Sequence, residues 1–553
     1  MGPLVSVLAA IVVHAAAQFG VGVQREVAGG WAFGLVLPYL LALLAMRSQA
    51  LGQRRASRVW LLLTDASGWI SYAVLTLGCG WLATVRRWTG ASLDVDAWPD
   101  LALGVSFLPF AVYQVIAIDA SVRAHSGIVA TRRSMRSFQL RMFVACASPI
   151  ALFLVISALL GRSEWLRVQV EHVGLASALF TLLMVVGLAW LLPAFLRWSW
   201  DTTPFPRGPV RDLLDLVARR ARFEPRALRV WNTGELMANA AIVGFGRRGR
   251  TVLFSDNLLS VLNNRELCAV YAHEIGHARR RHVGIFIAWV AAFVLVGDVA
   301  VRRVLDVEGE LLAATVAAGF FAAGVLGFGW LSRRYELDAD LFAVEVLEDQ
   351  PALVSALEQV GVHGRDRNGW RHFSVARRVD FLDRARTEPG FARSFRRRLA
   401  LYAATGIALA GLGAALQTVD LVGALPGDRA VASLARGRYD RAATLARALE
   451  GEDADDILAL ASAGASVGGP GVEALTDGLR AALGAGQDER ALRLARLARL
   501  RGVPAGRDVA RALESAREDD DEGLERALGR LDPDWRTAVR AAVGPRRPGA
   551  PQE

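Results

Sequence analysis

The chain has 553 residues, of which 53% are hydrophobic and 21% are charged, and its formal net charge is +10. With its 53 Gly counted and its 7 Tyr left out, the apolar share is about 61%, against roughly 45–50% in soluble domains. The charges cluster between long uncharged runs, which excludes an ordinary soluble enzyme and a disordered chain and indicates a membrane protein.

Every basic residue is Arg, and the arginines stand mostly at the ends of apolar runs, where membrane topology places them. This pattern argues against a nucleic-acid partner. The cysteines, Cys79, Cys146 and Cys268, lie far apart in the sequence, so they provide neither a disulfide framework nor a CxxC metal site.

Nine uncharged runs are long enough to cross a bilayer as helices. The first can instead be a signal peptide, because Ala15 to Ala17 suit a cleavage site, but the lack of a basic residue before Arg25 favours a retained span. The first six runs form an N-terminal membrane region, residues 1–196. The spans are expected near residues 2–23, 27–46, 66–85, 101–118, 142–161, 173–196, 284–301, 311–331 and 399–419.

Arginine-rich loops predict the orientation of these spans. Residues 47–58 and 122–141 carry several arginines and no acid, which places both loops in the cytoplasm. The loops near 86–100 and 162–171 carry acids beside their arginines and should face outward. Counting crossings then places residues 197–282 and 332–398 in the cytoplasm, and 302–310 and the tail after about Asp420 outside.

A small mixed α+β unit is expected ahead of the seventh span. Residues 208–222 have the spacing of an amphipathic helix, and 228–231, 239–244 and 251–255 are short β-type runs separated by Gly and Arg. This unit begins a domain over residues 197–398, which also takes in the seventh and eighth spans.

The segment His273-Glu274-Ile-Gly-His277 lies inside a helical pattern that begins near Arg265. Positions i and i+4 share one face of a helix, so both histidines can offer imidazole nitrogens to one Zn²⁺ ion. Glu274 then lies beside the metal as a general base toward water. A solvated His-rich helix is the competing interpretation of this segment alone.

A third ligand is available directly after the eighth span, where residues 332–340 read SRRYELDAD. A catalytic zinc usually has three protein ligands and one open position, and Glu336 can complete that set. Asp340 shares a helix face with Glu336 and can accept a hydrogen bond from a ligand imidazole, which fixes its tautomer. Asp338 should point away. Taken alone, these acids could equally be a membrane-proximal helix cap.

The ninth span, residues 399–424, precedes a tail over 425–553 that is rich in Ala, Leu and Arg at helical spacing. The segments that start at Gly437 and Gly486 resemble degenerate tetratricopeptide-type repeats, but their separation of 49 residues does not fit the usual period. A repeat array and a plain Ala/Arg-rich helical bundle therefore have equal weight.

These motifs together resemble the integral-membrane zinc metallopeptidases that include the CAAX prenyl proteases and the heat-shock HtpX-type proteases. The resemblance covers roughly residues 205–385, from the run Asn239-Ala-Ala-Ile-Val-Gly244 to the SRRYELDAD block. It implies one zinc ion per chain, held by the family's two histidines and the glutamate of its ExxAD block, which correspond to His273, His277 and Glu336. Glu274 corresponds to the glutamate that activates water.

The resemblance also implies roles for two further stretches. In the family the first stretch is an exposed strand beside the cleft, so substrate binding by strand pairing is expected at Asn239, Ala240, Ala241 and Gly244. A packed strand without substrate contact is the alternative.

The second stretch, residues 371–379, is similar to the family's His-Pro-Ser segment followed by an Arg-Ile pair, with Phe373 in place of the proline. It makes His372 and Arg378 candidate catalytic residues that stabilise the substrate or the transition-state oxyanion.

The expected fold class is a mainly α polytopic membrane protein of about nine spans, with a small α+β zincin-like metallopeptidase domain and a C-terminal helical-repeat-like tail. The expected activity is zinc-dependent endopeptidase cleavage of membrane or membrane-associated polypeptides at the cytoplasmic face, with protein quality control favoured by the resemblance. A multi-pass location in the lipid bilayer of a bacterial inner membrane is expected, with the tail outside.

Two other functions fit parts of the sequence. A membrane sensor or scaffold would bind a protein partner through the tail and keep a structural or regulatory metal site. A transporter would use intramembrane polar residues such as His14 and Asp65, which are costly to bury; Asp65 and Asp298 can also be explained as residues that snorkel or cap near span ends.

Overall fold

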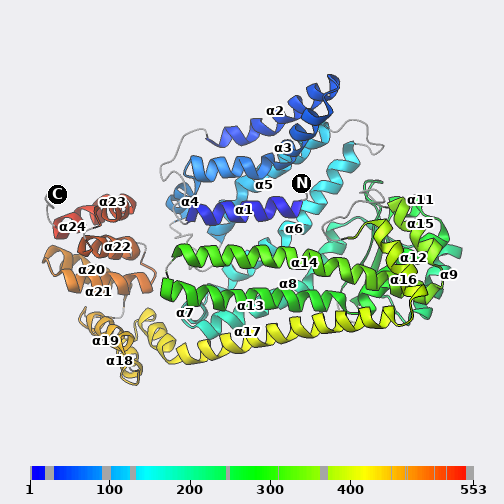
Figure 1. Ribbon diagram of the computed structural model, residues 1–553. Helices are drawn as coiled ribbons and strands as arrows, with labels where there is room; N and C mark the ends of the chain where they lie inside the picture. Colours follow the sequence, from blue (N-terminus) through cyan, green and yellow to red (C-terminus); the bar gives the residue numbers. More distant parts are fainter. Residues whose placement is uncertain are drawn as a thin grey trace, which may run out of the picture.

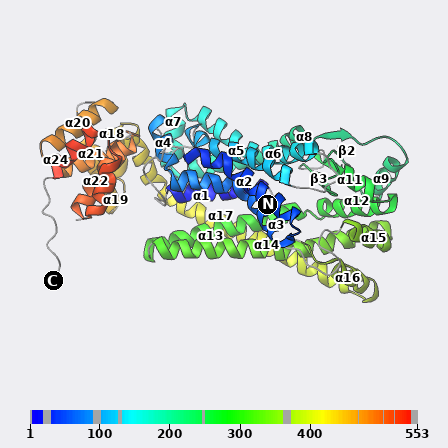
Figure 2. The same cartoon turned by 90° about the horizontal axis from the view of Figure 1, so that it is seen from above.

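Long helices run side by side through the middle of the molecule, with a small α+β unit at one end and an array of short helices at the other (Figure 1). A view from above keeps this order (Figure 2). This computed structural model describes residues 3–18, 30–89, 101–124, 132–244, 249–308, 310–360, 372–449, 451–467, 469, 471–503, 505–518 and 520–543. Most of the expected outward loop 86–100 and Arg371 lie outside the described residues.

The N-terminal region is built from helices that pack on one another along their length. Among the described residues, six helices are long and apolar enough to cross a membrane, and α7 with α8, which meet at a bend of 107°, would form a seventh span. The expectation of about nine spans stays a prediction. The helices of this region are α1 (Pro3–Gln18), α2 (Gly30–Ala50), α3 (Arg54–Ala73), the π-helical turn η1 (Val74–Gly78), α4 (Trp81–Thr89), α5 (Leu101–Ala124), α6 (Arg132–Leu160), α7 (Glu164–His172) and α8 (Gly174–Ser199).

The third expected span, residues 66–85, is placed wrongly by the sequence. The helix begins at Arg54 and runs through η1 to its end at Gly78, and Gly80, with a φ of 68°, separates it from α4. Arg54 and Arg55 are exposed in its first turn, so their charged ends reach solvent while the helix continues. The arginines therefore mark where the uncharged run begins, but the helix itself begins earlier in the chain.

The three intramembrane polar residues that the sequence analysis singled out, His14, Asp65 and Asp298, each contact a polar partner. His14 Nδ1 lies 3.2 Å from the Tyr72 hydroxyl, and Asp65 accepts a hydrogen bond from Ser121 Oγ at 2.6 Å. Asp298 accepts a hydrogen bond from Gln417 Nε2 at 2.9 Å and is paired with an arginine one turn along its helix. These contacts explain how the three polar side chains are accommodated.

The α+β unit contains a four-stranded sheet in the order β1-β2-β4-β3, formed by β1 (Thr202–Pro204), β2 (Ala227–Trp231), β3 (Ala240–Val243) and β4 (Thr251–Ser255). β2 and β4 are parallel, and β1 and β3 pair antiparallel on either side. Every residue of β4 is buried, which suits its apolar sequence TVLFS, whereas β3 lies at the edge. The three expected strands are confirmed, and β1 was not expected.

Helices pack on this sheet around a core that includes Leu214, Phe254, Tyr271 and Leu353. The expected helices near 208–222 and from Arg265 are confirmed. The helices are α9 (Pro209–Arg220), α11 (Asp256–Val261), α12 (Asn264–Arg279), α15 (Gln350–Val360) and α16 (Val375–Thr387).

α12 has a well-defined start because Asn263 and Glu266 form a capping box. The Asn263 side chain accepts hydrogen bonds from the backbone of the first turn, and Glu266 Oε2 accepts one from the Asn263 N–H at 2.8 Å. The other oxygen of Glu266 accepts hydrogen bonds from Ser355 and Gln359, both at 2.6 Å, which fastens α15 to α12.

Three long helices connect the unit to the rest of the molecule: α13 (His282–Glu308), α14 (Glu310–Leu347) and α17 (Phe391–Ala435). The expected outside turn at 302–310 is therefore mostly helical. The expected boundary at residue 425 also falls inside a helix, because α17 continues through Pro426. The Asp428 carboxylate on this continuation accepts a hydrogen bond from the Gly174 N–H at 2.8 Å, which ties it to the start of α8.

The tail is a helical array with a core of its own, which includes Leu475, Leu479 and Leu494. Gly437 and Gly486 both have positive φ and end their helices with the same hydrogen-bond pattern. The same helix-ending turn therefore occurs at both glycines. Whether the tail is a repeat array or a plain helical bundle stays open. The helices are α18 (Tyr439–Ala446), α19 (Glu452–Ala465), α20 (Val472–Gly484), α21 (Asp488–Leu500), α22 (Gly506–Arg517), α23 (Asp521–Arg530) and α24 (Pro533–Val543).

Candidate metal centre

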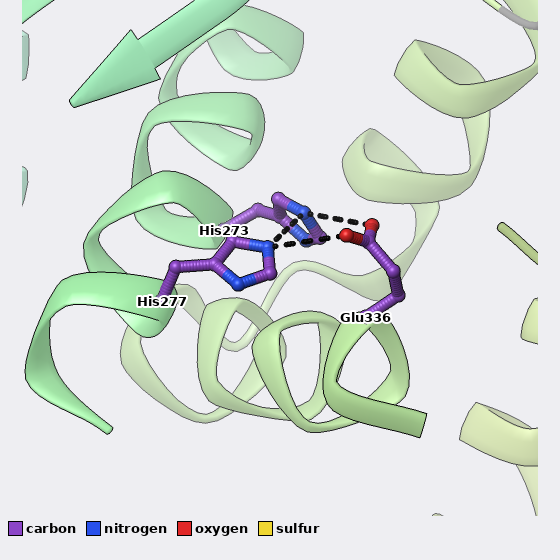
Figure 3. A group of neighbouring side chains, drawn as sticks. All are labelled: His273, His277 and Glu336. Carbon is purple, nitrogen blue, oxygen red and sulfur yellow. Dashed lines mark hydrogen bonds and ion pairs between the residues drawn. The ribbon is translucent and has the colours of Figure 1, made fainter. Parts of the chain in front are cut away.

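The site forms where α12 passes close to α14. A Cβ on Gly276 would lie 3.1 Å from the Cα of Ala339 and 3.2 Å from its carbonyl oxygen, so a glycine at this position allows the two backbones to approach. The approach brings one face of α12 against the part of α14 that follows its apolar segment. His273 and His277 on α12 point toward Glu336 on α14 (Figure 3).

The three side chains present their donor atoms to one point. The Nε2 atoms of His273 and His277 are 3.2 Å apart, and each lies 3.5 Å from an oxygen of Glu336. Four-coordinate zinc holds its nitrogen and oxygen ligands at about 2.0–2.1 Å, which separates ligands of a tetrahedron by roughly 3.3–3.4 Å. His273 and Glu336 are buried. The donor set therefore fits a single divalent metal ion.

Asp340 holds the far side of the His273 ring. Its Oδ1 lies 2.9 Å from His273 Nδ1, and its Oδ2 accepts a hydrogen bond from Arg378 Nε at 2.6 Å. Burial alone would raise the pKa of Asp340, but Arg378 and His273 hold it below its usual value. A charged carboxylate here favours the Nδ1–H tautomer of His273, which leaves Nε2 as a donor toward the metal position.

A second contact chain holds His277, and the sequence analysis missed it. His277 Nδ1 lies 2.9 Å from His282 Nδ1, and His282 Nε2 lies 3.1 Å from Asp338 Oδ2. Asp338 also accepts a hydrogen bond from Arg396 Nε at 3.3 Å. As expected, Asp338 does not join the donor group. The available signal was His282 itself, a polar residue at the very start of an apolar helix, where burial is costly.

Glu274 follows His273 on α12 and is half-buried. Burial raises the pKa of its carboxyl to about 7, while the His273 charge acts in the opposite direction. A carboxyl group with a pKa near neutrality can both accept and release a proton. The role of Glu274 as a general base stays a prediction.

His372 and Arg378 occupy different sides of the site. His372 has 55% of its side chain exposed, and its Nδ1 lies 3.0 Å from Glu336 Oε2, on the solvent side of the donor group. Arg378 is buried and donates to both oxygens of Asp340. Its guanidinium is thus engaged behind His273, and contact of Arg378 with a substrate stays a prediction.

The expected substrate strand lies at the edge of the sheet and packs beside α12. β3 pairs with β4 on one side, and Asn239 extends this pairing through two hydrogen bonds of 2.9 Å with Ser255. Gly244 ends the strand with a φ of 113°, where a Cβ would lie 2.3 Å from the Gly249 carbonyl oxygen. The four expected residues therefore lie together at the sheet edge that packs against α12, the helix of both histidines.

The segment before β3 is fixed by Asp256. Its Oδ2 accepts hydrogen bonds from the backbone N–H groups of Gly234 at 2.8 Å and Glu235 at 3.2 Å, and its Oδ1 accepts one from Asn257 at 2.9 Å. These bonds and the Thr233 hydroxyl hold the pKa of Asp256 below its usual value, against the effect of burial. Asp256 thereby ties the backbone of Gly234 and Glu235 to the start of α11.

In a comparison with known protein families, residues 207–396 match the family described as "Peptidase family M48". The chain is 29% identical over 181 residues to "CAAX prenyl protease 1 homolog" of Arabidopsis thaliana, which covers 28% of this chain and 42% of that protein. It is 31% identical over 140 residues to "Protease HtpX homolog" of Bacteroides fragilis, covering 22% of this chain and 43% of the relative. This chain thus spans less than half the length of these two relatives.

Two further similarities cover more of the known protein. "Protease HtpX homolog" of Polynucleobacter necessarius is 28% identical over 239 residues, which is 39% of this chain and 76% of the relative. The crystal structure of S. mikatae Ste24p has a TM-score of 0.44 and 12% identity, with 67% of this chain and 98% of that one covered.

Proposed function

From the match of residues 207–396 to Peptidase family M48, we propose that this chain is a membrane-embedded, zinc-dependent endopeptidase. It hydrolyses peptide bonds of membrane or membrane-associated polypeptides. The observation that carries the proposal is the group of His273, His277 and Glu336, whose ligand atoms all lie within 4.8 Å of one another. One zinc ion per chain suits two imidazoles and a carboxylate with a further position open.

When bound, the zinc ion lowers the pKa of water and polarises the scissile carbonyl. Glu274 takes a proton from the attacking water and returns it to the leaving amine, so that the C–N bond breaks with a carboxylic acid and an amine as products. Asp340, backed by Arg378, keeps the His273 ring in one tautomer. His372, exposed beside Glu336, stabilises the oxyanion that develops on the carbonyl oxygen.

Substrate binding is assigned to the edge strand β3. An extended peptide that pairs with the backbone of Asn239, Ala240, Ala241 and Gly244 would be held mainly by main-chain hydrogen bonds. The two alanines offer little side-chain selectivity, so the proposed cleavage is broad in sequence. Broad cleavage of extended segments suits protein quality control, the role proposed for the chain.

The proposed location of the site is the cytoplasmic face of a bacterial inner membrane, with the tail on the opposite face. The arginine-rich ends of the first membrane helices support this orientation. The separate core of α18 to α24, at the far end of α17, supports a second candidate function in which the tail binds a protein partner. That function can accompany peptidase activity or replace it.

The test compares the purified full chain with its Glu274→Gln variant on an unfolded model protein, with bound zinc measured on the same samples. Loss of the general base should lower the cleavage rate by roughly 10²–10⁴-fold and leave zinc bound. Glu224→Gln, a change at an exposed position between α9 and β2, is the matched control and should cleave like the unmodified chain. Equal cleavage by Glu274→Gln contradicts the role of Glu274, and absence of zinc from all samples contradicts the metal site.

A further inference from the structure

A cavity of about 380 Å³ lies between α14, α16 and α17. Its wall contains four arginines, Arg334, Arg377, Arg384 and Arg398, and a single acid, Asp380. Phenylalanine, tyrosine and leucine side chains complete the wall, so the cavity combines positive charge with apolar surface. None of these four arginines takes part in the proposed peptide cleavage.

The cavity lies where the apolar segments of two long helices end. By sequence, the apolar segment of α14 ends just before Arg333 and Arg334, and that of α17 begins just after Arg398. The two helices are held at matching height, because the Tyr335 hydroxyl donates a hydrogen bond to the Leu399 carbonyl oxygen at 3.3 Å and the rings of Trp330 and Tyr402 are 5.0 Å apart. Trp and Tyr are enriched at the interface between hydrocarbon and water.

The positive charge of the cavity is only partly compensated. Arg384 forms an ion pair with Glu388 at 2.8 Å. Arg334 lies over the Trp330 ring at 3.6 Å and Arg377 over the Phe373 ring at 4.3 Å, so aromatic faces orient two guanidinium groups. In the part of the chain that the structure describes, no carboxylate forms an ion pair with Arg334, Arg377 or Arg398.

Burial is the main cause that lowers the pKa of the Arg334 guanidinium. The charges of Arg333, Arg377 and Arg398 act in the same direction, against the effect of Tyr402. An anion placed among Arg334, Arg377 and Arg398 would relieve the repulsion between their charges. Arginine suits a phosphate anion in particular, because its planar donors match two phosphate oxygens at once.

We propose that this cavity binds the headgroup of an anionic phospholipid through Arg334, Arg377 and Arg398. A lipid fits better than free phosphate for two reasons. The cavity lies where the apolar segments of α14 and α17 end, and its wall offers apolar side chains, among them Leu337, Phe381 and Leu399, to the first carbons of a lipid. Basic pockets between membrane helices are known to hold such headgroups.

The site would connect the lipid to the metal centre. Leu337, which follows Glu336, lies in the cavity wall, and Arg377 directly precedes Arg378, the partner of Asp340. A bound headgroup therefore restrains the first turn of α16 and the metal-proximal part of α14. This proposal goes beyond peptide cleavage and does not depend on it, and its test measures lipid alone.

The test uses the full chain reconstituted in phosphatidylcholine vesicles with a trace of spin-labelled lipid, either phosphatidylglycerol or phosphatidylcholine. Electron spin resonance gives the relative association of the two lipids with the protein. The unmodified chain should prefer phosphatidylglycerol, and Arg334→Gln/Arg398→Gln should lower that preference roughly tenfold, since each arginine near an anionic headgroup contributes to the attraction.

Two further variants make the result specific. Arg334→Lys/Arg398→Lys keeps both charges and should keep most of the preference, which separates loss of charge from misfolding. Arg54→Gln/Arg55→Gln removes two exposed arginines at the start of α3, outside the cavity, and should leave the preference unchanged. Equal association of both lipids with the unmodified chain overturns the proposal, as does an equal loss in the α3 variant. Abolition of the preference by millimolar inorganic phosphate would assign the site to free phosphate instead of a lipid.

Discussion

Both histidines of the donor group keep one ring nitrogen engaged on the side away from Glu336. A neutral imidazole carries a single N–H, so an Nδ1 that donates leaves the Nε2 lone pair for the metal position. His273 Nδ1 donates to Asp340, and His277 Nδ1 can donate to His282, whose own Nε2–H donates to Asp338. The two chains end on carboxylates paired with arginine, which makes the tautomers of both rings definite.

His282 can be tested without measuring cleavage. His282→Phe removes the acceptor for His277 Nδ1–H, and by analogy with other outer-shell partners it should weaken zinc binding roughly 10–100-fold in competition with a chromophoric chelator. His282→Gln retains one acceptor and one donor and should recover part of the affinity. The absorption bands of the cobalt-loaded chain should change in the Phe variant. Unchanged affinity and unchanged bands in His282→Phe would show that the ring is only packing.

The residues of the donor group and Glu274 could be singled out from the sequence because they lie in short motifs, each on one helix. Spacing of four residues dictates that His273 and His277 share a face, whatever the fold. The contact of His282 with Asp338 could not, because it joins residues 56 positions apart that only the packing of α13 against α14 brings together. The same reason applies to Arg378, whose position behind Asp340 depends on how α16 folds back.

At the scale of elements, the site depends on how closely α12 and α14 approach. α14 runs without interruption from its apolar segment into the α+β unit, so Glu336 is held on a stiff helix. Local patterns were enough to predict α12 and three of the strands, since their apolar periods are clear. They missed the helix start at Arg54 and the continuation of α17 through residue 425, because arginines and Pro426 can lie within helices.

Gly276→Val tests this approach. The branched side chain would meet the backbone of Ala339, so the helices must separate and the free energy of unfolding should fall by about 1–3 kcal/mol, as in other overpacked cores. Zinc affinity should fall with it, because Glu336 moves away from the histidines. Gly284→Val is the control, since a Cβ at Gly284 meets nothing within 4 Å. An equal effect of both substitutions on the melting temperature and on zinc binding would contradict the argument.

At the scale of the whole molecule, the candidate metal centre and the helical array lie at opposite ends of the long helices (Figure 1). Hydropathy predicted long apolar helices between the two ends, because that prediction depends only on apolar length. Separation of the two ends into different compartments by a membrane stays a prediction. Which end is cytoplasmic depends on loop charges and stays a prediction.

Single cysteines can test the arrangement. In a chain with its three native cysteines replaced by Ser, Glu224→Cys lies in the α+β unit and Gln487→Cys in the array, both at exposed positions. A membrane-impermeant maleimide should label only Gln487→Cys in intact cells and only Glu224→Cys in inverted vesicles. Labelling of both positions from the same side would contradict the opposite placement, and the reverse pattern would invert the proposed orientation.

The continuity of α17 has a mechanical consequence. At a rise of 1.5 Å per residue its 45 residues extend about 67 Å. Phe395, near one end, is embedded in the core around the candidate metal centre, and Leu434, near the other, in the core of the array. A continuous helix whose two ends are packed in different cores transmits rotation and displacement from one core to the other. Any load that a binding partner places on the array would therefore arrive, as twist or displacement, beside the helices that hold the donor group.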